Sequence, residues 1–272
     1  MKLSIIIPVL NSHEILRRLF LYFEKIGIPD DTEIIIVDDG SDPPLRYEPK
    51  DFTEILDEKN LSCTDEGSFE AISEYKELPV KIIYTNDKRP WTWALARNRG
   101  AKEAQGEYLL MFDVDHIITR ETIDLARTFG GHKIQFKREL GVLLEDGTLT
   151  QDRDILKSYG MLDRDIALSP LPNNFVMRKD TFFELGGYRE DLAERPYPQG
   201  EDRRFKKAWC EWSRANNKEV HPYRPTMYMF PNGKYCGDVD FNPFGLFHNL
   251  SRKTRRNFWY KKQRTMEVVW NS

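Results

Sequence analysis

The run EYLLMFDVDH, residues 107–116, is the feature that most restricts how this chain can fold. Its apolar centre suits a fully buried strand, which two aspartates one residue apart, Asp113 and Asp115, end abruptly. A strand that ends in Asp-x-Asp places both carboxylates at one edge of a sheet. There they can hold a hard divalent cation together with a phosphate. A solvated turn at the end of a strand is the simpler alternative.

Apolar runs alternate with helical patterns along the first half of the chain. The predicted order is a strand at 3–9, a helix near 12–26, a strand at 33–39, a strand at 80–85, a helix near 93–104 and a strand at 108–112. Continuous apolar strands separated by helices imply an α/β fold, in which helices cover both faces of a mostly parallel sheet. Ligands of such sheets bind beyond the carboxyl ends of the strands, where the acidic pairs at 38–39 and 113–115 both fall. The two pairs are therefore expected to share one cleft.

Composition permits an enzyme and excludes some other classes of protein. The 272 residues, 40% of them hydrophobic, can bury a full core. No stretch approaches the roughly 18 apolar residues of a membrane span, and the three cysteines lack metal-type spacing, so we expect a cytoplasmic protein. A net charge of -3 argues against a uniformly basic nucleic-acid binder.

Charge is nevertheless unevenly placed along the chain. Residues 48–77 carry ten acidic residues and three lysines, which indicates a solvated insertion. The segment 252–264, RKTRRNFWYKKQR, carries seven basic residues, no acidic residue and three adjacent aromatic residues. Such a tail suits contact with phosphate, nucleic acid, an anionic acceptor or an anionic membrane surface. A helical end with a solvated basic face is the alternative.

Five pieces of sequence carry a resemblance to a known family. They are IIIPVLNS, IIIVDDGSD, ARNRGAKEAQGEYLLMFDVD, LGGYRED and GEDRRF, in this order within residues 3–205. Together they resemble the inverting nucleotide-sugar glycosyltransferases of family two, which have the GT-A fold. The insertion between Asp42 and Val80 is longer than that family usually carries, and the motif that follows the general base in processive synthases is absent. The resemblance therefore implies transfer of a single sugar.

The resemblance also implies how the chain is divided. Residues 1–130 would form the nucleotide-sugar-binding half of one GT-A domain, residues 131–250 the acceptor-binding half, and residues 251–272 a basic aromatic tail.

A donor site at the edge of the sheet follows from the same resemblance. The donor would be a nucleoside-diphosphate sugar, with UDP favoured, and Mn2+ or Mg2+ would stabilise the leaving diphosphate. Asp115 is the expected direct metal ligand, while Asp113 would hold the donor ribose or a metal-bound water. Asp39 would bind the nucleobase. Asp38 would instead accept backbone amides in its own turn.

Three further positions are expected near the donor. Pro8 would line the base pocket through its backbone. Arg97 would reach the diphosphate or the base, with a surface salt bridge as the alternative. His248 would supply a third metal ligand or be a satisfied core residue, and His116 is a weaker candidate for that ligand position.

Inversion requires a carboxylate base on the face of the sugar opposite the leaving group. Asp202 in GEDRRF occupies the family position of that base, and Glu201 would bind an acceptor hydroxyl or act as the base itself. Capping of the helix predicted from residue 202 by both acids is the alternative. The acceptor stays open: a saccharide, a lipid-linked glycan, a protein side chain and a modified nucleic acid all present a hydroxyl.

Two other functional classes also stay open. A nucleotidyltransferase uses metal-binding acids on a doubly wound sheet, but it should carry a glycine-rich phosphate loop after the first strand, and PVLNSHE has no glycine. A non-catalytic nucleotide- or nucleic-acid-binding module would rely on the basic tail and would not need Asp202.

Overall fold

The computed structural model describes residues 1–46, 71–72, 78–87, 89, 92–161, 166–194, 200–219 and 225–231. Its central sheet contains the strands β1 (Leu3–Val9), β2 (Thr32–Asp38), β3 (Ala71–Ile72), β4 (Val80–Tyr84), β5 (Tyr108–Met111), β7 (Lys133–Gln135) and β12 (Phe175–Arg178). These seven strands lie in the order β3-β4-β2-β1-β5-β12-β7. The pairs β4-β2, β2-β1 and β1-β5 are parallel, whereas β12 is antiparallel to both of its neighbours. The edge strand β3 is also antiparallel to β4, so the sheet is mixed, with three parallel and three antiparallel pairs. The predicted α/β class is confirmed, and the expected parallel arrangement is found in the contiguous strands β4, β2, β1 and β5.

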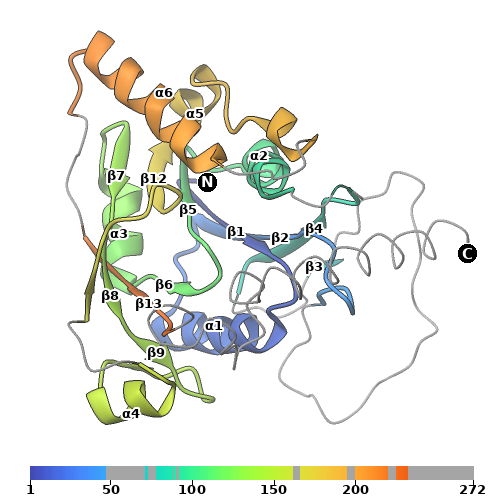
Figure 1. Ribbon diagram of the computed structural model, residues 1–272, viewed down its shortest axis with the longest axis vertical. Coiled ribbons are helices and arrows are strands. Elements are labelled where there is room, and N and C mark those ends of the chain that lie inside the picture. The colour runs from blue at the N-terminus through green and yellow to red at the C-terminus, as the bar shows by residue number, and fades with distance from the viewer. Residues whose placement is uncertain are drawn as a thin grey trace, which may run out of the picture.

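The helices cover both faces of this sheet. In chain order, the helices within the described residues are α1 (His13–Ile26), α2 (Trp93–Glu103), α3 (Arg120–Thr128), α4 (Arg153–Ser158), α5 (Lys179–Glu184) and α6 (Glu201–Ala215), with a 3-10 helix at Glu190–Glu194. Figure 1 shows α1 on one face and α2, α5 and α6 on the other. Side chains of β1 alternate accordingly: Ile5 and Ile7 belong to the core under α1, and Ile6 to the core under α2.

A glycine lets α2 lie close to the sheet. A Cβ atom on Gly100 would lie 2.5 Å from Cγ2 of Ile6 and 3.0 Å from Cγ2 of Val37. Any larger residue would therefore push α2 away from β1 and β2. This close packing fixes the position of the first turn of α2, which contributes to the site described below.

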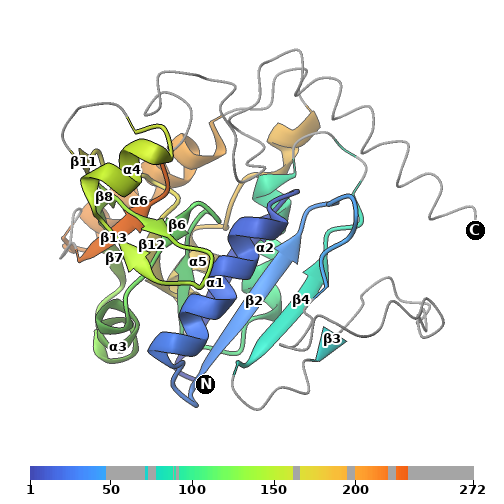
Figure 2. The same ribbon diagram turned by 90° about the horizontal axis from the view of Figure 1, so that it is seen from below.

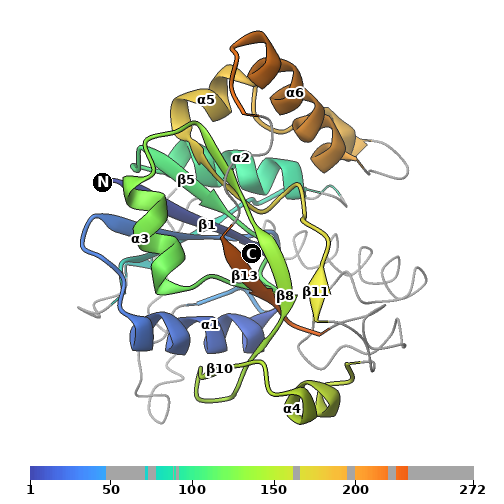
Figure 3. The same cartoon turned by 90° about the vertical axis from the view of Figure 1, so that its left-hand side faces the viewer.

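A smaller sheet lies beside the central one. It contains β6 (His116–Ile117), β8 (Lys137–Leu140), β11 (Ala167–Leu168) and β13 (Thr226–Met229), in the order β11-β8-β13-β6. Strands β9 (Val142–Leu143) and β10 (Leu149–Thr150) form a separate antiparallel pair. Figure 2 shows β2 and β4 on one side of α1 and the small sheet on the other, and Figure 3 shows β8 and β13 from the side. Residues of α1 and of the small sheet share one apolar core.

The predicted bounds of the regular elements agree closely with the structure. The strand at 3–9 has its predicted bounds, and the other predicted elements differ from the observed ones by a single residue at one or both ends. Within the described residues, no helix is long and apolar enough to cross a membrane.

Candidate active site

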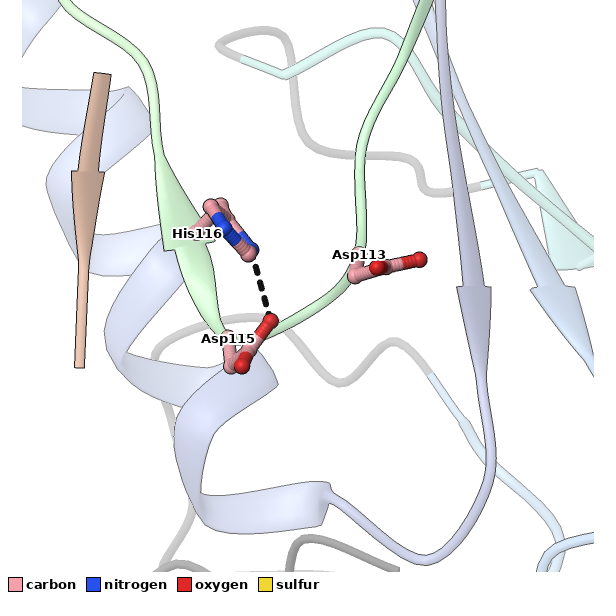
Figure 4. A group of neighbouring side chains, drawn as sticks. All are labelled: Asp113, Asp115 and His116. Atoms are coloured by element: carbon pink, nitrogen blue, oxygen red, sulfur yellow. Dashed lines mark hydrogen bonds and ion pairs between the residues drawn. The ribbon is translucent and has the colours of Figure 1, made fainter. Parts of the chain in front are cut away.

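Acidic residues gather where two strands of the central sheet end. Asp39 directly follows β2, Asp113 lies two residues after β5, and β1 lies between these two parallel strands. The connection from β5 to β6 carries Asp113 and Asp115, and His116 begins β6 (Figure 4). One ligand atom from each of these three side chains lies within 4.8 Å of the other two. Carboxylate oxygens are hard ligands, so the two aspartates of this group fit Mn2+ or Mg2+.

Asp38 organises the turn that follows β2. Its Oδ1 accepts hydrogen bonds from the backbone N–H groups of Gly40 (3.1 Å) and Ser41 (2.7 Å), and its Oδ2 accepts one from Leu45 (2.8 Å). The predicted role of Asp38 in its own turn is confirmed. Because Asp38 is used in this way, Asp39 is the member of the pair that remains for a ligand.

Two hydroxyl groups orient the carboxylate of Asp39, which is 2% exposed. Its Oδ1 accepts hydrogen bonds from Oγ1 of Thr85 (2.9 Å) and Oγ1 of Thr92 (2.5 Å). Thr85 directly follows β4 and Thr92 is the N-cap residue of α2. The carboxylate is therefore held by the end of a third strand and by the start of a helix.

Arg97 forms an ion pair with Asp113. Its Nη2 donates to Oδ1 of Asp113, and its guanidinium lies 5.4 Å from the ring centroid of Tyr188. Burial alone would lower the pKa of Arg97, but the negative charges of Asp113 and Glu201 raise it overall. The salt bridge given as the alternative is therefore present, but with Arg97 only 3% exposed it is buried on the arginine side and not at the surface. A buried guanidinium needs an anionic partner, and Asp113 is that partner here.

The N-terminal part of α2 therefore holds both acids. Thr92 at its N-cap donates to Asp39, and Arg97 one turn later donates to Asp113. Since Gly100 fixes α2 against the sheet, the same helix sets the relative positions of the two carboxylates.

Two buried donor groups close to Asp113 have no partner within the part of the chain that the structure describes. They are Nε of Arg97 and Nδ2 of Asn174, whose Oδ1 accepts the backbone N–H of Asp113 at 3.2 Å. An unsatisfied buried donor costs about 1–3 kcal/mol, so native proteins contain few of them. Two such donors beside one carboxylate are typical of a site that a ligand completes.

The start of α6 brings two more carboxylates to this region. Gly200 precedes the helix with φ 92°, Glu201 is 7% exposed, and Asp202 is half-buried. Oδ1 of Asp202 accepts the backbone N–H of Arg203 at 2.7 Å. The helix is fixed to the site by Phe205, whose ring stacks on that of Tyr188 with centroids 4.5 Å apart.

Asp113, Glu201 and Asp202 all act electrostatically on Tyr188. Its pKa is raised, first by burial and then by the charges of Asp113, Glu201 and Asp202, against the lowering effect of Arg97. The structure therefore brings the predicted base candidates close to the first predicted metal-binding aspartate.

Other predicted positions are placed as follows. Pro8 is a buried residue of β1 that pairs with Val37 of β2. His248, the basic tail at 251–272 and most of the acidic insertion lie outside the described residues.

Four residues that contact the predicted acids or Arg97 were missed in the sequence. They are Thr85, Thr92, Asn174 and Tyr188. Thr85 stands at the end of a predicted strand, and Thr92 is an N-cap residue type directly before a predicted helix, so both had a local signal. Tyr188 lies inside LGGYRED, one of the five motif pieces. Asn174 has no signal in the sequence, because only the pairing of β12 with β5 brings it to Asp113.

Comparison with known proteins finds glycosyltransferases similar to this chain. The model of the family "Glycosyl transferase family 2" matches residues 61–126, which include α2, β5 and both metal-binding candidates. Poly(ribitol-phosphate) beta-N-acetylglucosaminyltransferase TarS of Staphylococcus aureus (strain Mu50 / ATCC 700699) is 26% identical over 133 residues, which are 47% of this chain and 19% of the relative. TarS of S. aureus strain MW2 matches to the same extent. The match thus spans about a fifth of the length of these relatives.

Solved structures of glycosyltransferases are also similar. S. aureus TarS 1-349 in complex with UDP has 17% identity and a TM-score of 0.45, with 96% of this chain and 70% of that chain covered. Mannosyltransferase PcManGT from Pyrobaculum calidifontis, in complex with GDP-Man and Mn2+, has 12% identity and a TM-score of 0.44, with 93% and 64% covered. The family model and the curated relatives confirm the resemblance to family-two glycosyltransferases and support an enzyme of that class.

Proposed function

We propose that this protein is a metal-dependent inverting glycosyltransferase that moves one sugar from a nucleoside-diphosphate sugar, UDP favoured, to an acceptor hydroxyl. The observation that carries the proposal is the N-terminal part of α2, which holds Asp39 and Asp113 at the ends of the parallel strands β2 and β5. A base-binding carboxylate and a phosphate-side carboxylate at fixed separation suit a ligand with a nucleobase at one end and a diphosphate at the other.

The donor would lie across this edge of the sheet. Asp39 would accept the imide N–H of uracil, with Pro8 beside the base, and Asp113 would hold the ribose or a metal-bound water. Asp115 would be the direct ligand of Mn2+ or Mg2+, with His248 as a further candidate ligand. When bound, the metal ion would neutralise the charge that grows on the leaving diphosphate. Arg97 has an unused Nε–H and would add a positive charge on the same side.

Asp202 would take the proton of the attacking hydroxyl. Its position at the start of α6 is half-exposed and therefore open to an acceptor, while Glu201 is buried and would orient the acceptor or position Asp202. Attack on the face opposite the diphosphate forms the new glycosidic bond as the bond to the diphosphate breaks, and the anomeric configuration inverts.

Calorimetric titration tests the donor half of the proposal. UDP, GDP and dTDP would be titrated with and without Mn2+ into the wild type, Asp115→Asn and the control Asp30→Asn, which alters an exposed aspartate outside the site. We expect metal-dependent binding of UDP that is lost in Asp115→Asn and kept in the control. Binding that is indifferent to metal and to Asp115 would refute the proposed site.

A second experiment tests the chemistry. With a UDP-sugar as donor and water as acceptor, proton NMR would identify the anomer of the sugar released first, and an inverted anomer is expected. Asp202→Asn should slow this turnover by about 10²–10⁴-fold while UDP affinity is unchanged. UDP binding without any turnover in the wild type would instead support the non-catalytic nucleotide-binding module.

A further inference from the structure

A chain of hydrogen bonds leads from Asp115 into the small sheet. Oδ1 of Asp115 lies 2.6 Å from Nδ1 of His116, and Nε2 of His116 lies 3.2 Å from Nη1 of Arg138. Nε of Arg138 donates in turn to the backbone oxygen of Ser169 at 2.7 Å. Asp115, His116 and Arg138 are all at most 5% exposed, so water competes little with these contacts.

The register of the small sheet creates this chain. His116 on β6 pairs with Met229 on β13, and Arg138 on β8 pairs with Met227 on the same strand. Paired residues lie on one face, as do residues two apart in a strand, so His116 and Arg138 share a face across β13. The guanidinium passes the sulfur of Met229, with Nη1 3.2 Å from Sδ, and reaches the imidazole.

These contacts determine which nitrogen of His116 carries the proton. A guanidinium has N–H donors and no acceptor, so Nε2 of His116 must be the acceptor in its contact with Arg138. The ring proton then sits on Nδ1, which donates to Asp115. Both ring nitrogens are occupied, and neither has a lone pair directed at a metal ion. His116 therefore lies behind the carboxylate and outside the ligand shell, although its ring is close enough to the two aspartates to suggest a third ligand.

We propose that Arg138 and His116 are positioning residues for Asp115. Arg138 fixes the tautomer of His116, and the Nδ1–H of His116 fixes the carboxylate that would bind the metal. This inference rests on the proposed function, because it gives the pair a task in holding a metal ligand. Outer partners of this kind typically change metal affinity by 10–100-fold when they are removed.

The segment that accepts from Arg138 also contacts Asp113. Ser169, which accepts from Arg138, lies in the segment between β11 and β12, and Asn174 later in that segment accepts the backbone N–H of Asp113. The connection from β5 to β6 is thus held at both aspartates by residues of the second half of the chain.

Three variants and one matched control test the inference. Arg138→Met removes the guanidinium and keeps an apolar side chain beside Met229. His116→Asn places an amide donor near the position of Nδ1, and His116→Phe removes both ring nitrogens. Arg18→Met is the control, because Arg18 is 6% exposed and donates to the backbone oxygen of Leu143 at 2.8 Å.

Mn2+ affinity in the presence of UDP would be measured by calorimetry, with circular dichroism to compare folding. We expect Arg138→Met and His116→Phe to weaken Mn2+ binding by about 10–100-fold. We expect His116→Asn to retain more affinity than His116→Phe, and Arg18→Met to match the wild type. A folded Arg138→Met protein with wild-type Mn2+ affinity would overturn the inference.

A second measurement needs no metal. Long-range proton–nitrogen NMR spectra of the metal-free protein report which ring nitrogen of His116 is protonated. We expect Nδ1–H and a bare Nε2 in the wild type, and loss of this single tautomer in Arg138→Met. A proton on Nε2 would overturn the inference even if Mn2+ binds. A wild type that binds no Mn2+ would refute the proposed metal dependence, while the tautomer would still decide the role of Arg138.

Discussion

Replacement of Lys133 by methionine should stabilise this protein, and the gain should depend on pH. Lys133 lies on β7 and is 1% exposed. Its Nζ lies 5.0 Å from the ring centroid of Trp209, 5.2 Å from that of Phe175 and 6.0 Å from that of Phe205. Burial, reinforced by the charge of Lys206, lowers the pKa of Lys133 from 10.5 to about 7.

The size of the effect follows from this shift in pKa. The unfolded chain binds the proton up to about pH 10.5 and the folded protein only up to about 7, so folding at intermediate pH releases a proton. The stability of the protein therefore falls as the pH decreases from 10.5 to 7, by up to about 5 kcal/mol. Cation–π attraction to the aromatic rings offsets roughly 1–2 kcal/mol of this penalty. Methionine has a similar volume and no charge, so Lys133→Met should gain about 2–3 kcal/mol at pH 7 and under about 1 kcal/mol at pH 10.

Urea unfolding followed by circular dichroism at several values between pH 6 and pH 10 measures this difference. Lys102→Met is the matched control, because Lys102 is an exposed residue of α2 and its replacement should change stability by less than about 0.5 kcal/mol. The reasoning fails if Lys133→Met is no more stable than the wild type at pH 7. It also fails if the gain is equal at pH 7 and pH 10. The cost of removing the proton from Lys133 on folding must decrease as the pH approaches 10.5, the pKa in the unfolded chain.

Two further predictions concern the surroundings of the site. Gly187 has φ +62°, and a Cβ there would lie 2.8 Å from Oδ1 of Asn98, so Gly187→Ala should cost about 2–3 kcal/mol in thermal unfolding. Gly186→Ala is its control: with φ +80° and no atom within 4 Å of the new Cβ, it should cost only about 1–2 kcal/mol, and equal losses would contradict the steric argument. Thr85→Val keeps the shape of the side chain but removes a hydrogen bond to Asp39, so UDP should bind roughly 10-fold more weakly in calorimetry. Unchanged UDP affinity would contradict the proposed contact between Asp39 and the nucleobase.

Much of the central sheet could be predicted because its signals are local. β1 and β2 each contain an unbroken apolar run, residues 5–9 and 34–37, and every residue of both strands is buried, so these runs stand out from the flanking sequence. The Asp-x-Asp pair could be predicted for a related reason, since two acids that directly follow such a run must lie at the edge of the sheet.

The small sheet and the contacts it makes could not be predicted in this way. Its strands have two to four residues, which is too short for a period-two pattern to be distinguished from a loop. Arg138 and His116 are 22 positions apart and meet only through the register of β13. Lys133 shows the same limit, because a lysine at the start of the three-residue edge strand β7 gives no indication that α6 covers it.

The connection from β5 to β6 has a thermodynamic consequence. It leaves the central sheet at Met111 and enters the small sheet at His116, so residues 112–115 join the two sheets directly. A ligand that shifts the small sheet would displace the aspartates, and a cation held by those aspartates would resist that shift. Binding of a ligand to the small sheet and binding of a cation to the aspartates would then be linked. Each would change the affinity of the protein for the other by the same factor. An acceptor bound against the small sheet would thereby change the affinity of the aspartates for the cation.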